Sequence, residues 1–285
     1  MLKRTIRSVA RRARDWVTEG SSEVDPDTQP TATAWLNAEQ KKILHKSEGW
    51  RRPNYSWGVL YGVHLAASLK IPRVSVLEFG VAGGNGLVSL ELIAKDVEAV
   101  FGVGIDVYGF DIGTGLPAPV DHRDSPNLFQ TAAFPMDTQK LQSRLTKAKL
   151  MLGDVAETVP KFVASGPAPV AFIAFDLDLW SSTNQALKVF DAPSASLLPR
   201  VYSYFDDTLG MTHNEFAGER LSIQEFNAGH DTRKIAQIPG LKHFVLPSLA
   251  NQWWVDSFYL AHIFDHEMYD RPDGLVKTTR MDLER

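Results

Sequence analysis

The residues with the clearest chemical meaning lie in the segment VSVLEFGVAGGNG, which spans residues 74–86. Its apolar first half is typical of a buried parallel strand, and its glycines, among them Gly80 and Gly84, let the backbone bend sharply and approach a ligand before a helix begins. The spacing is GxxGxxG rather than the GxGxxG of dinucleotide sites. Glu78 would repel a pyrophosphate at this turn but would attract an amine. The turn therefore favours a nucleoside that carries a cationic amino acid, such as S-adenosylmethionine, over NAD.

Acidic residues follow the apolar segments that are typical of strands. They are Glu78, Asp111, Asp154, Asp176, Asp206 and Asp207. In a doubly wound sheet the carboxyl ends of the strands share one rim, so we expect these acids to converge on one crevice. There Asp111 would accept hydrogen bonds from a ribose diol, Asp154 would accept one from an adenine amino group, and Glu78 would hold a methionyl ammonium. An aspartate at such a position also serves as a helix cap, and this alternative stays open for each aspartate.

The acids outnumber those that a nucleoside needs. Asp176, Asp178, Asp206 and Asp207 would repel one another in a shared cleft unless a cation lies among them. The chain has no cysteine, and all-oxygen ligation favours a hard ion such as Mg²⁺. Such an ion would orient an acceptor hydroxyl and stabilise the alkoxide that attacks a methyl group. The catalytic candidates are Asp176 and, as the base that takes the proton, His213, for which a surface position is the alternative interpretation.

A sheet has to position these residues, and the hydrophobic pattern predicts one. Strands are expected at 73–80, 105–111, 149–154, 170–176 and 201–207, and helices at 57–69, 86–102, 155–164, 182–190 and 215–227. Two further strands, HFVLPS (243–248) and DSFYLAHIF (256–264), are expected to form a hairpin at the sheet edge. The predicted fold class is therefore α/β, a doubly wound, mostly parallel seven-stranded sheet with an antiparallel C-terminal edge hairpin.

The chain divides into three predicted parts. Residues 1–17 form a basic amphipathic helix. It makes a weak contact with an anionic membrane surface or an acidic partner, serves as a targeting presequence, or rests, solvated, on the domain. Residues 18–33 are polar and are typical of a flexible linker. Residues 34–285 form the catalytic domain, with an insertion at 112–147 that is helical from Asp137.

Composition excludes several classes of protein. The formal net charge of −4 gives no indication of nucleic-acid binding. The lack of cysteine excludes disulfides and thiol nucleophiles, and it suits a cytoplasmic location. No apolar run is long enough to span a membrane. The expected partner is a small hydroxylated acceptor, and we also expect a homo-oligomer.

Two segments could cover the rim. Segment 49–61, GWRRPNYSWGVLY, has two interpretations. It is a lid over the cofactor or a platform for a sugar or aromatic acceptor, or else it is an aromatic-rich helix start that packs on the sheet edge. In the insertion, Arg123 either clamps a carboxylate or phosphate of the acceptor or forms a local surface pair with an aspartate.

Four segments together resemble the class I S-adenosylmethionine-dependent methyltransferases, and most of all the macrocin and mycinamicin sugar O-methyltransferases of macrolide biosynthesis. They are LEFGVAGGNG (77–86), GFDIGTGLPAP (109–119), FDLDLWSSTNQAL (175–187) and YFDDTLG (204–210). The resemblance implies a Rossmann-like methyltransferase fold and a methyl ether product. The cofactor contacts that it implies are Glu78, Gly80 and Asp111, and the implied magnesium ligands are Asp176, Asp206 and Asp207. Leu177 stands where that family has a glycine, and the family's catalytic histidine has no assigned counterpart here.

The expected function is therefore an S-adenosylmethionine-dependent, divalent-metal-assisted O-methyltransferase that acts on a hydroxyl of a sugar or other secondary metabolite. Three alternatives stay open: a nicotinamide-dependent oxidoreductase on the same layout, an iron-using hydroxylase-like relative, and a non-catalytic relative that only binds the cofactor. The glycine spacing and Glu78 argue against the nicotinamide enzyme.

Overall fold

The computed structural model describes residues 32–275, in which seven strands form one sheet of order β3-β2-β1-β4-β5-β7-β6. Strands β1 to β5 are parallel, and β7 runs antiparallel to both β5 and β6. The strands are β1 Arg73–Phe79, β2 Gly104–Asp111, β3 Lys149–Leu152, β4 Val170–Phe175, β5 Leu197–Phe205, β6 Arg233–Gln237 and β7 Phe258–Ile263. The predicted fold class, a doubly wound and mostly parallel sheet with an antiparallel C-terminal edge, is confirmed.

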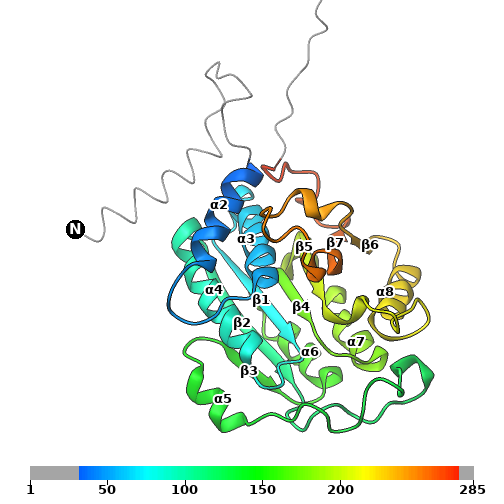
Figure 1. Cartoon of the computed structure of the whole chain (residues 1–285). Coiled ribbons are helices and arrows are strands. Elements are labelled where there is room, and N and C mark those ends of the chain that lie inside the picture. The colour runs from blue at the N-terminus through cyan, green and yellow to red at the C-terminus, as the bar shows by residue number, and fades with distance from the viewer. Residues whose placement is uncertain (1–31, 276–285) are drawn as a thin grey trace, which may run out of the picture.

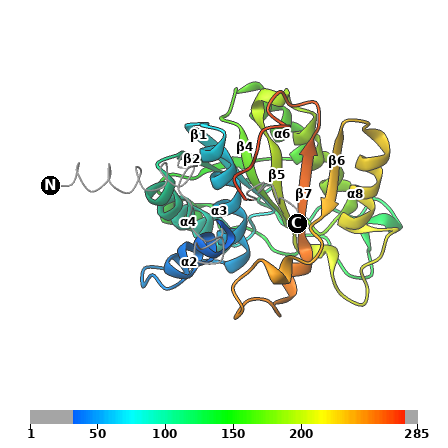
Figure 2. The ribbon, with the colours of Figure 1, turned by 90° about the horizontal axis from the view of Figure 1, so that it is seen from above.

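Helices cover both faces of this sheet (Figures 1 and 2). One face carries α2 Ala32–Leu44, α3 Pro53–Ser68 and α4 Asn85–Phe101, and the other carries α6 Val155–Ala164, α7 Trp180–Ala186 and α8 Gly218–Gly229. The insertion, drawn in green, passes beside the carboxyl ends of the strands (Figure 1). Within it, α5 Thr138–Arg144 begins after Asp137, whose side chain accepts a hydrogen bond from the backbone N–H of Lys140 at 3.0 Å. The predicted helical start at Asp137 is thus confirmed, and it follows from an N-cap.

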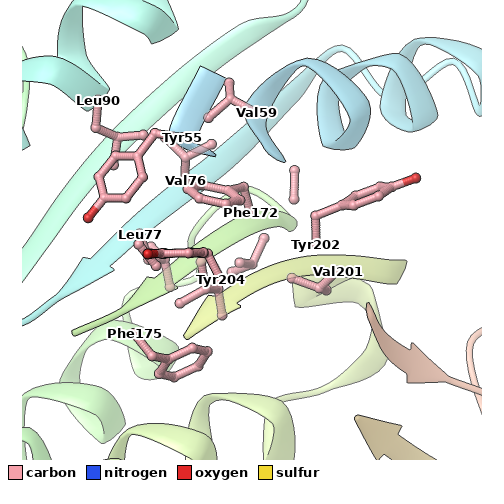
Figure 3. Close-up of a cluster of buried hydrophobic side chains, with 14 of the residues drawn as sticks. Tyr55, Val59, Val76, Leu77, Leu90, Phe172, Phe175, Val201, Tyr202 and Tyr204 are labelled. Carbon is pink, nitrogen blue, oxygen red and sulfur yellow. The ribbon is translucent and has the colours of Figure 1, made fainter. Parts of the chain in front are cut away.

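Helix α3 is buried along most of its length. Pro53 occupies its first turn, where a fixed φ and a missing N–H are no disadvantage. Figure 3 shows Tyr55 and Val59 of α3 packed over Val76 and Phe172 of the sheet, with Tyr204 beside them. All five side chains are buried. The helical part of segment 49–61 therefore packs on the sheet, as one of the two interpretations predicted, and this packing fixes Tyr55 beside the end of β1.

The first arm of the predicted edge hairpin was wrong. Residues 243–248 lie in a 3₁₀ turn and loop, and the strand that pairs with β7 is β6. HFVLPS has the apolar residues of a strand but does not form one, because Phe244 is exposed and Pro247 has no N–H to donate to a neighbouring strand. β6 was missed because it is an edge strand in which only Ile235 is buried, so that its sequence is mostly polar.

The predicted basic helix at 1–17 lies outside the described residues, and so do residues 18–31 of the predicted linker. The last two linker positions, Ala32 and Thr33, fall within α2. Between residues 32 and 275, no helix has both the length and the apolar character that crossing a membrane requires.

Candidate functional site

A row of buried phenylalanines fixes where four neighbouring strands end. These residues are Phe110 on β2, Phe79 on β1, Phe175 on β4 and Phe205 on β5. They pair in register, and adjacent rings stack with centroids 4.5 to 5.4 Å apart. The residues that follow them are Asp111, Gly80, Asp176 and Asp206. Because strands in register end at the same height, the aromatic row sets the glycine turn and three acids side by side at the carboxyl rim.

The glycine-rich turn after β1 is held by Asp111. Its Oδ2 accepts hydrogen bonds from the backbone N–H groups of Val81 at 2.9 Å and Ala82 at 2.8 Å, and its Oδ1 accepts one from Gly113 at 2.6 Å. A carboxylate offers about four acceptor positions, so one remains for a ligand. The structure shows that Asp111 shapes the turn, and its contact with a ribose diol stays a prediction.

Two glycines of this turn are required by close approach. A Cβ on Gly80 would lie 1.7 Å from the carbonyl oxygen of Asp176. Gly84 caps α4 with a φ of 80°, and a Cβ there would lie 2.2 Å from Leu141 of α5. Side chains at these positions would push the turn away from the neighbouring strand and from α5.

Glu78 is a buried carboxylate beside this turn, with 1% of its surface exposed. The Tyr55 hydroxyl donates to its Oε1 at 2.7 Å, and its Oε2 has no hydrogen-bond partner among the described residues. Burial raises the pKa of Glu78 to about 7, although the Arg52 charge and the Tyr55 hydrogen bond oppose that rise. A buried carboxylate oxygen without a partner is costly, so Oε2 could accept a hydrogen bond from a cationic ligand group.

Arg52 lines the cavity, although the sequence analysis gave it no role of its own within segment 49–61. Its Nη1 donates to the Tyr55 hydroxyl at 3.1 Å and lies 3.8 Å from Asp176 Oδ2. Burial would lower the pKa of Arg52, but the charges of Tyr55, Glu78 and Asp176 outweigh burial and raise it above its usual value. Arg52 is therefore a fixed positive charge between Glu78 and the acids at the ends of β4 and β5.

Three aspartates form a group that could hold a metal ion. One carboxylate oxygen from each of Asp176, Asp206 and Asp207 lies within 4.8 Å of the other two. The Tyr204 hydroxyl donates to Asp206 Oδ1 at 2.5 Å, whereas Asp207 Oδ2 is buried without a hydrogen-bond partner among the described residues. The oxygen donors, their spacing and the orphaned oxygen fit a hard divalent cation.

The proton affinities of this region reflect its crowded negative charge. Burial, followed by the charges of Asp206 and Asp207, raises the pKa of Asp176 well above its usual range. Burial and neighbouring aspartates raise the pKa of Asp207 to about 8 and that of Asp178 to about 6. Buried Glu219 of α8 accepts a hydrogen bond from the backbone N–H of Asp207 at 3.0 Å, and burial and the Asp207 charge raise its pKa too. A bound divalent cation would reverse these shifts.

One cavity of about 630 Å³ brings most of the predicted residues together. Its lining includes Glu78, Gly80, Gly84, Asp111, Asp154, Asp176 and Asp206. Asp207 and His213 do not line it, although Asp207 belongs to the acid group beside it. His213 lies in the loop after β5, with its ring 6.5 Å from that of Phe129, and burial followed by the Arg220 charge lowers its pKa. The volume is within the range of small-molecule sites.

Asp154 stands at the rim of this cavity as the N-cap of α6. Its Oδ1 accepts a hydrogen bond from the backbone N–H of Ala156 at 2.8 Å. Asp154 is therefore a helix cap, as the alternative interpretation predicted. Its second carboxylate oxygen is available for the contact with an adenine amino group, which stays a prediction.

The insertion is anchored to α7 by Asp124, whose side chain is fully buried. Asp124 accepts hydrogen bonds from the backbone N–H and the hydroxyl of Ser181 at 2.7 and 2.9 Å, and from the backbone N–H of Val120 at 2.8 Å. Val120 and Ser181 both line the cavity. The sequence singled out Asp124 only within the triplet 122–124 and as a surface residue beside Arg123; the structure shows instead that it sets one wall of the site.

Arg123 is held locally. It pairs with Asp121 at 2.7 Å, and its guanidinium carbon lies 3.5 Å from the centroid of the Trp180 ring. The local-pair interpretation of Arg123 is confirmed, and cation–π contact adds to it.

Comparison with known proteins found no matching protein family and no matching curated protein. Among solved structures, the chain is similar to the O-methyltransferase NovP, with 12% identity and a TM-score of 0.48 over 73% of this chain and 79% of that one. It is similar to CalS11, a TDP-rhamnose 3′-O-methyltransferase of calicheamicin biosynthesis, with 20% identity and a TM-score of 0.40 over 82% and 90%. It is also similar to the MycE methyltransferase in complex with Mg, SAH and mycinamycin VI, with 16% identity and a TM-score of 0.35 over 80% of this chain and 53% of that one. At such values, the function of this chain has to be argued from its own residues.

Proposed function

We propose that this chain is an S-adenosylmethionine-dependent O-methyltransferase, assisted by a divalent cation, that acts on a hydroxyl of a small molecule such as a sugar or other secondary metabolite. The observation that carries the proposal is the buried Oε2 of Glu78, which has no hydrogen-bond partner within residues 32–275 and lies in the cavity that Asp176 and Asp206 also line. Six carboxyl groups line this cavity, from Glu78, Asp111, Asp154, Asp176, Asp178 and Asp206. Such a lining attracts a nucleoside with an ammonium and a sulfonium, and it repels a pyrophosphate.

The geometry supports a role for three residues as cofactor contacts. Glu78 would hold the methionyl ammonium through Oε2, because Tyr55 already occupies and orients the other oxygen. Asp111 would accept from a ribose hydroxyl through its remaining acceptor position, and Asp154 would accept from the adenine amino group. When bound, the cofactor supplies an electrophilic methyl group.

The acid group would hold the cation and, through it, the acceptor. Asp176, Asp206 and Asp207 would be the ligands, with Tyr204 orienting Asp206 and Glu219 holding the backbone of Asp207. When bound, a cation such as Mg²⁺ lowers the pKa of an acceptor hydroxyl and orients it. Asp176 lines the cofactor cavity and belongs to the acid group, so the acceptor would meet the methyl group at this residue.

The acceptor proton needs a base. His213, with its lowered pKa, is neutral at physiological pH and can accept a proton. His213 does not line the cavity, so it would have to approach the acceptor when the site is loaded. His213→Ala should lower turnover and leave S-adenosylhomocysteine affinity unchanged.

Calorimetric titration of the full chain with S-adenosylhomocysteine, with and without Mg²⁺, tests the proposal. We expect binding of S-adenosylhomocysteine and no binding of NAD. Binding of NAD alone would favour the oxidoreductase. Methyl transfer that survives chelation would remove the role of the cation. Iron that co-purifies with the chain at the acid group would favour a hydroxylase-like relative.

A further inference from the structure

The part of the chain that the structure describes brings one positive charge to the cavity. Among the described residues that line it, Arg52 is the only lysine, arginine or histidine. The proposed cofactor carries one negative charge, the carboxylate of its methionyl group, and the proposed function assigns no partner to it. An ionised carboxylate placed among six carboxyl groups without a cation would be strongly disfavoured.

Arg52 and Glu78 lie on either side of one hydroxyl group. The Tyr55 hydroxyl accepts from Arg52 Nη1 at 3.1 Å and donates to Glu78 Oε1 at 2.7 Å. The two opposite charges are thus separated by a single oxygen atom. An α-amino acid carries its ammonium and its carboxylate on the same carbon atom, so its two charges are separated by a similarly short span.

The guanidinium of Arg52 is positioned but has donors to spare. Its carbon lies 5.0 Å from the centroid of the Tyr55 ring and 5.9 Å from that of Trp50, and its backbone N–H donates to the Ser89 hydroxyl at 2.7 Å. Asp176 Oδ2, at 3.8 Å, is beyond hydrogen-bond distance. A guanidinium offers five N–H donors in a planar fork that matches a carboxylate, and Tyr55 uses one of them.

We propose that Arg52 binds the carboxylate of the methionyl group, so that Arg52 and Glu78 together recognise the amino-acid zwitterion of the cofactor. This inference rests on the proposed function. It makes Arg52 a cofactor-binding residue, and it explains why a basic side chain lies in an otherwise acidic cavity. It also predicts selectivity between ligands that differ only in the carboxylate.

Three ligands test the inference by calorimetry without added divalent metal: S-adenosylhomocysteine, its decarboxylated analogue, and methylthioadenosine, which lacks the whole amino-acid group. The wild-type chain should bind S-adenosylhomocysteine about 10- to 100-fold more tightly than the decarboxylated analogue. Arg52→Gln should lower the affinity for S-adenosylhomocysteine by a similar factor and leave the affinities for the other two ligands unchanged. The two ammonium-bearing ligands should then bind alike.

Arg73→Gln is the matched control, because Arg73 pairs with Asp106 at 2.8 Å and is the first residue of β1, at the opposite end of that strand from the cavity. It should change none of the three affinities. Arg52→Lys keeps the charge without the fork, so the preference for S-adenosylhomocysteine should shrink without vanishing.

The results separate the inference from the proposed function. A wild-type chain that binds neither S-adenosylhomocysteine nor methylthioadenosine contradicts the proposed function. A wild-type chain that binds S-adenosylhomocysteine and its decarboxylated analogue equally well overturns the inference alone, and so does an Arg52→Gln variant with the wild-type preference. If Arg52→Gln also loses affinity for methylthioadenosine, the Arg52→Lys variant decides. A preference of Arg52→Lys for S-adenosylhomocysteine over the decarboxylated analogue that equals the wild-type preference would show that Arg52 does not bind the carboxylate.

Discussion

The Asp111 carboxylate at the end of β2 accepts hydrogen bonds from two consecutive backbone N–H groups, those of Val81 and Ala82, in the turn after β1. Ala82 has a φ of 44°, in a region that residues other than glycine rarely adopt. The two hydrogen bonds offset part of the cost of that conformation, because they hold the two consecutive peptide groups that lead into Ala82. The end of one strand therefore shapes the ligand-binding turn of its neighbour.

Removal of this carboxylate should affect stability and ligand binding together. Asp111→Ala leaves three backbone donors without their acceptor, so we expect a loss of about 2 kcal/mol in the free energy of unfolding. Affinity for S-adenosylhomocysteine should fall at least about tenfold, because the turn loses its shape as well as the ribose contact. Chemical denaturation and calorimetry measure the two effects.

Asp106→Ala is the control for Asp111→Ala, because Asp106 lies on the same strand and makes an exposed pair with Arg73. It should change stability by less than about 1 kcal/mol and leave affinity unchanged. If Asp111→Ala keeps full stability and loses only affinity, Asp111 contacts the ligand and does not support the turn.

The stability of the metal-free chain should fall as pH rises. Burial raises the pKa of Glu78 from 4.5 to about 7, and burial with neighbouring acids raises that of Asp207 from 3.8 to about 8. The folded chain therefore holds these protons more tightly than the unfolded chain does. Its stability is greatest below the unfolded pKa values and is lost as pH rises through the folded ones. In Glu78→Gln, the fall in the free energy of unfolding with rising pH should be smaller by about 3 kcal/mol. Denaturation at a series of pH values measures it. A stability that rises with pH would contradict this account.

Affinity for the proposed cofactor should change with pH in the opposite direction. Glu78 must be ionised to hold an ammonium, and burial raises its pKa to about 7, so S-adenosylhomocysteine should bind more tightly as pH rises through that value. Glu78→Gln should bind weakly and show a flat profile. Calorimetry at the same pH values as the stability measurements gives the affinity of both proteins. If affinity rises with pH in Glu78→Gln as it does in the wild type, Glu78 is not the group whose ionisation strengthens binding.

The sequence predicted the rim of the sheet because apolar strands ended in acids. The Phe-Gly and Phe-Asp pairs at 79–80, 110–111, 175–176 and 205–206 are visible in the chain, and their register follows once parallel strands are assumed. The sequence could not separate Arg51 from Arg52. Arg51 forms a buried pair with Asp96 at 2.5 Å, whereas Arg52 lines the cavity. No local pattern distinguishes them, because the partner of Arg51 lies 45 positions away, on α4.

The burial of Asp124 and the strand β6 were missed for related reasons. Asp124 is buried only because the insertion folds onto Ser181, which lies 57 positions away in the chain. β6 pairs with a strand that follows it after a long connection, and its exposed face hides the strand pattern. Predictions from the sequence were reliable where a residue's neighbours along the chain determine its environment, and they failed where distant segments do.

Neutralising one acid of the metal group should stabilise the metal-free chain and abolish its response to metal. The pKa of Asp207 is raised to about 8 by burial and by Asp178 and Asp206, so Asp207→Asn removes a disfavoured charge and should raise stability by about 1 kcal/mol or more near pH 8. Mg²⁺ should raise the melting temperature of the wild type by mass action and leave that of Asp207→Asn unchanged. Asp191→Asn, at an exposed aspartate that contacts His230, should respond to Mg²⁺ as the wild type does. An Asp207→Asn variant that still responds would place the cation elsewhere.

Two glycines of the same turn should differ in their tolerance of a methyl group. A Cβ on Gly86 would lie 1.8 Å from Glu78 Oε1, whereas a Cβ on Gly83 would meet nothing within 4 Å. Gly86 lies in the first turn of α4, where alanine is intrinsically better than glycine by about 1 kcal/mol. If Glu78 did not stand there, Gly86→Ala would therefore stabilise the chain. We expect instead a loss of about 1–3 kcal/mol from the displaced carboxylate, and a change within about 0.5 kcal/mol for Gly83→Ala.

A double variant decides whether Glu78 causes that loss. In Gly86→Ala combined with Glu78→Ala, the added methyl group no longer meets a carboxylate, so alanine at position 86 should regain its helix propensity. The double variant should then be at least as stable as Glu78→Ala alone, in chemical denaturation at a pH where Glu78 of the wild type is ionised. If Gly86→Ala costs as much stability in the Glu78→Ala background as in the wild type, the strain comes from the backbone of the turn. The close approach of α4 to β1 would then serve packing, and the position of the Glu78 carboxylate would need another explanation.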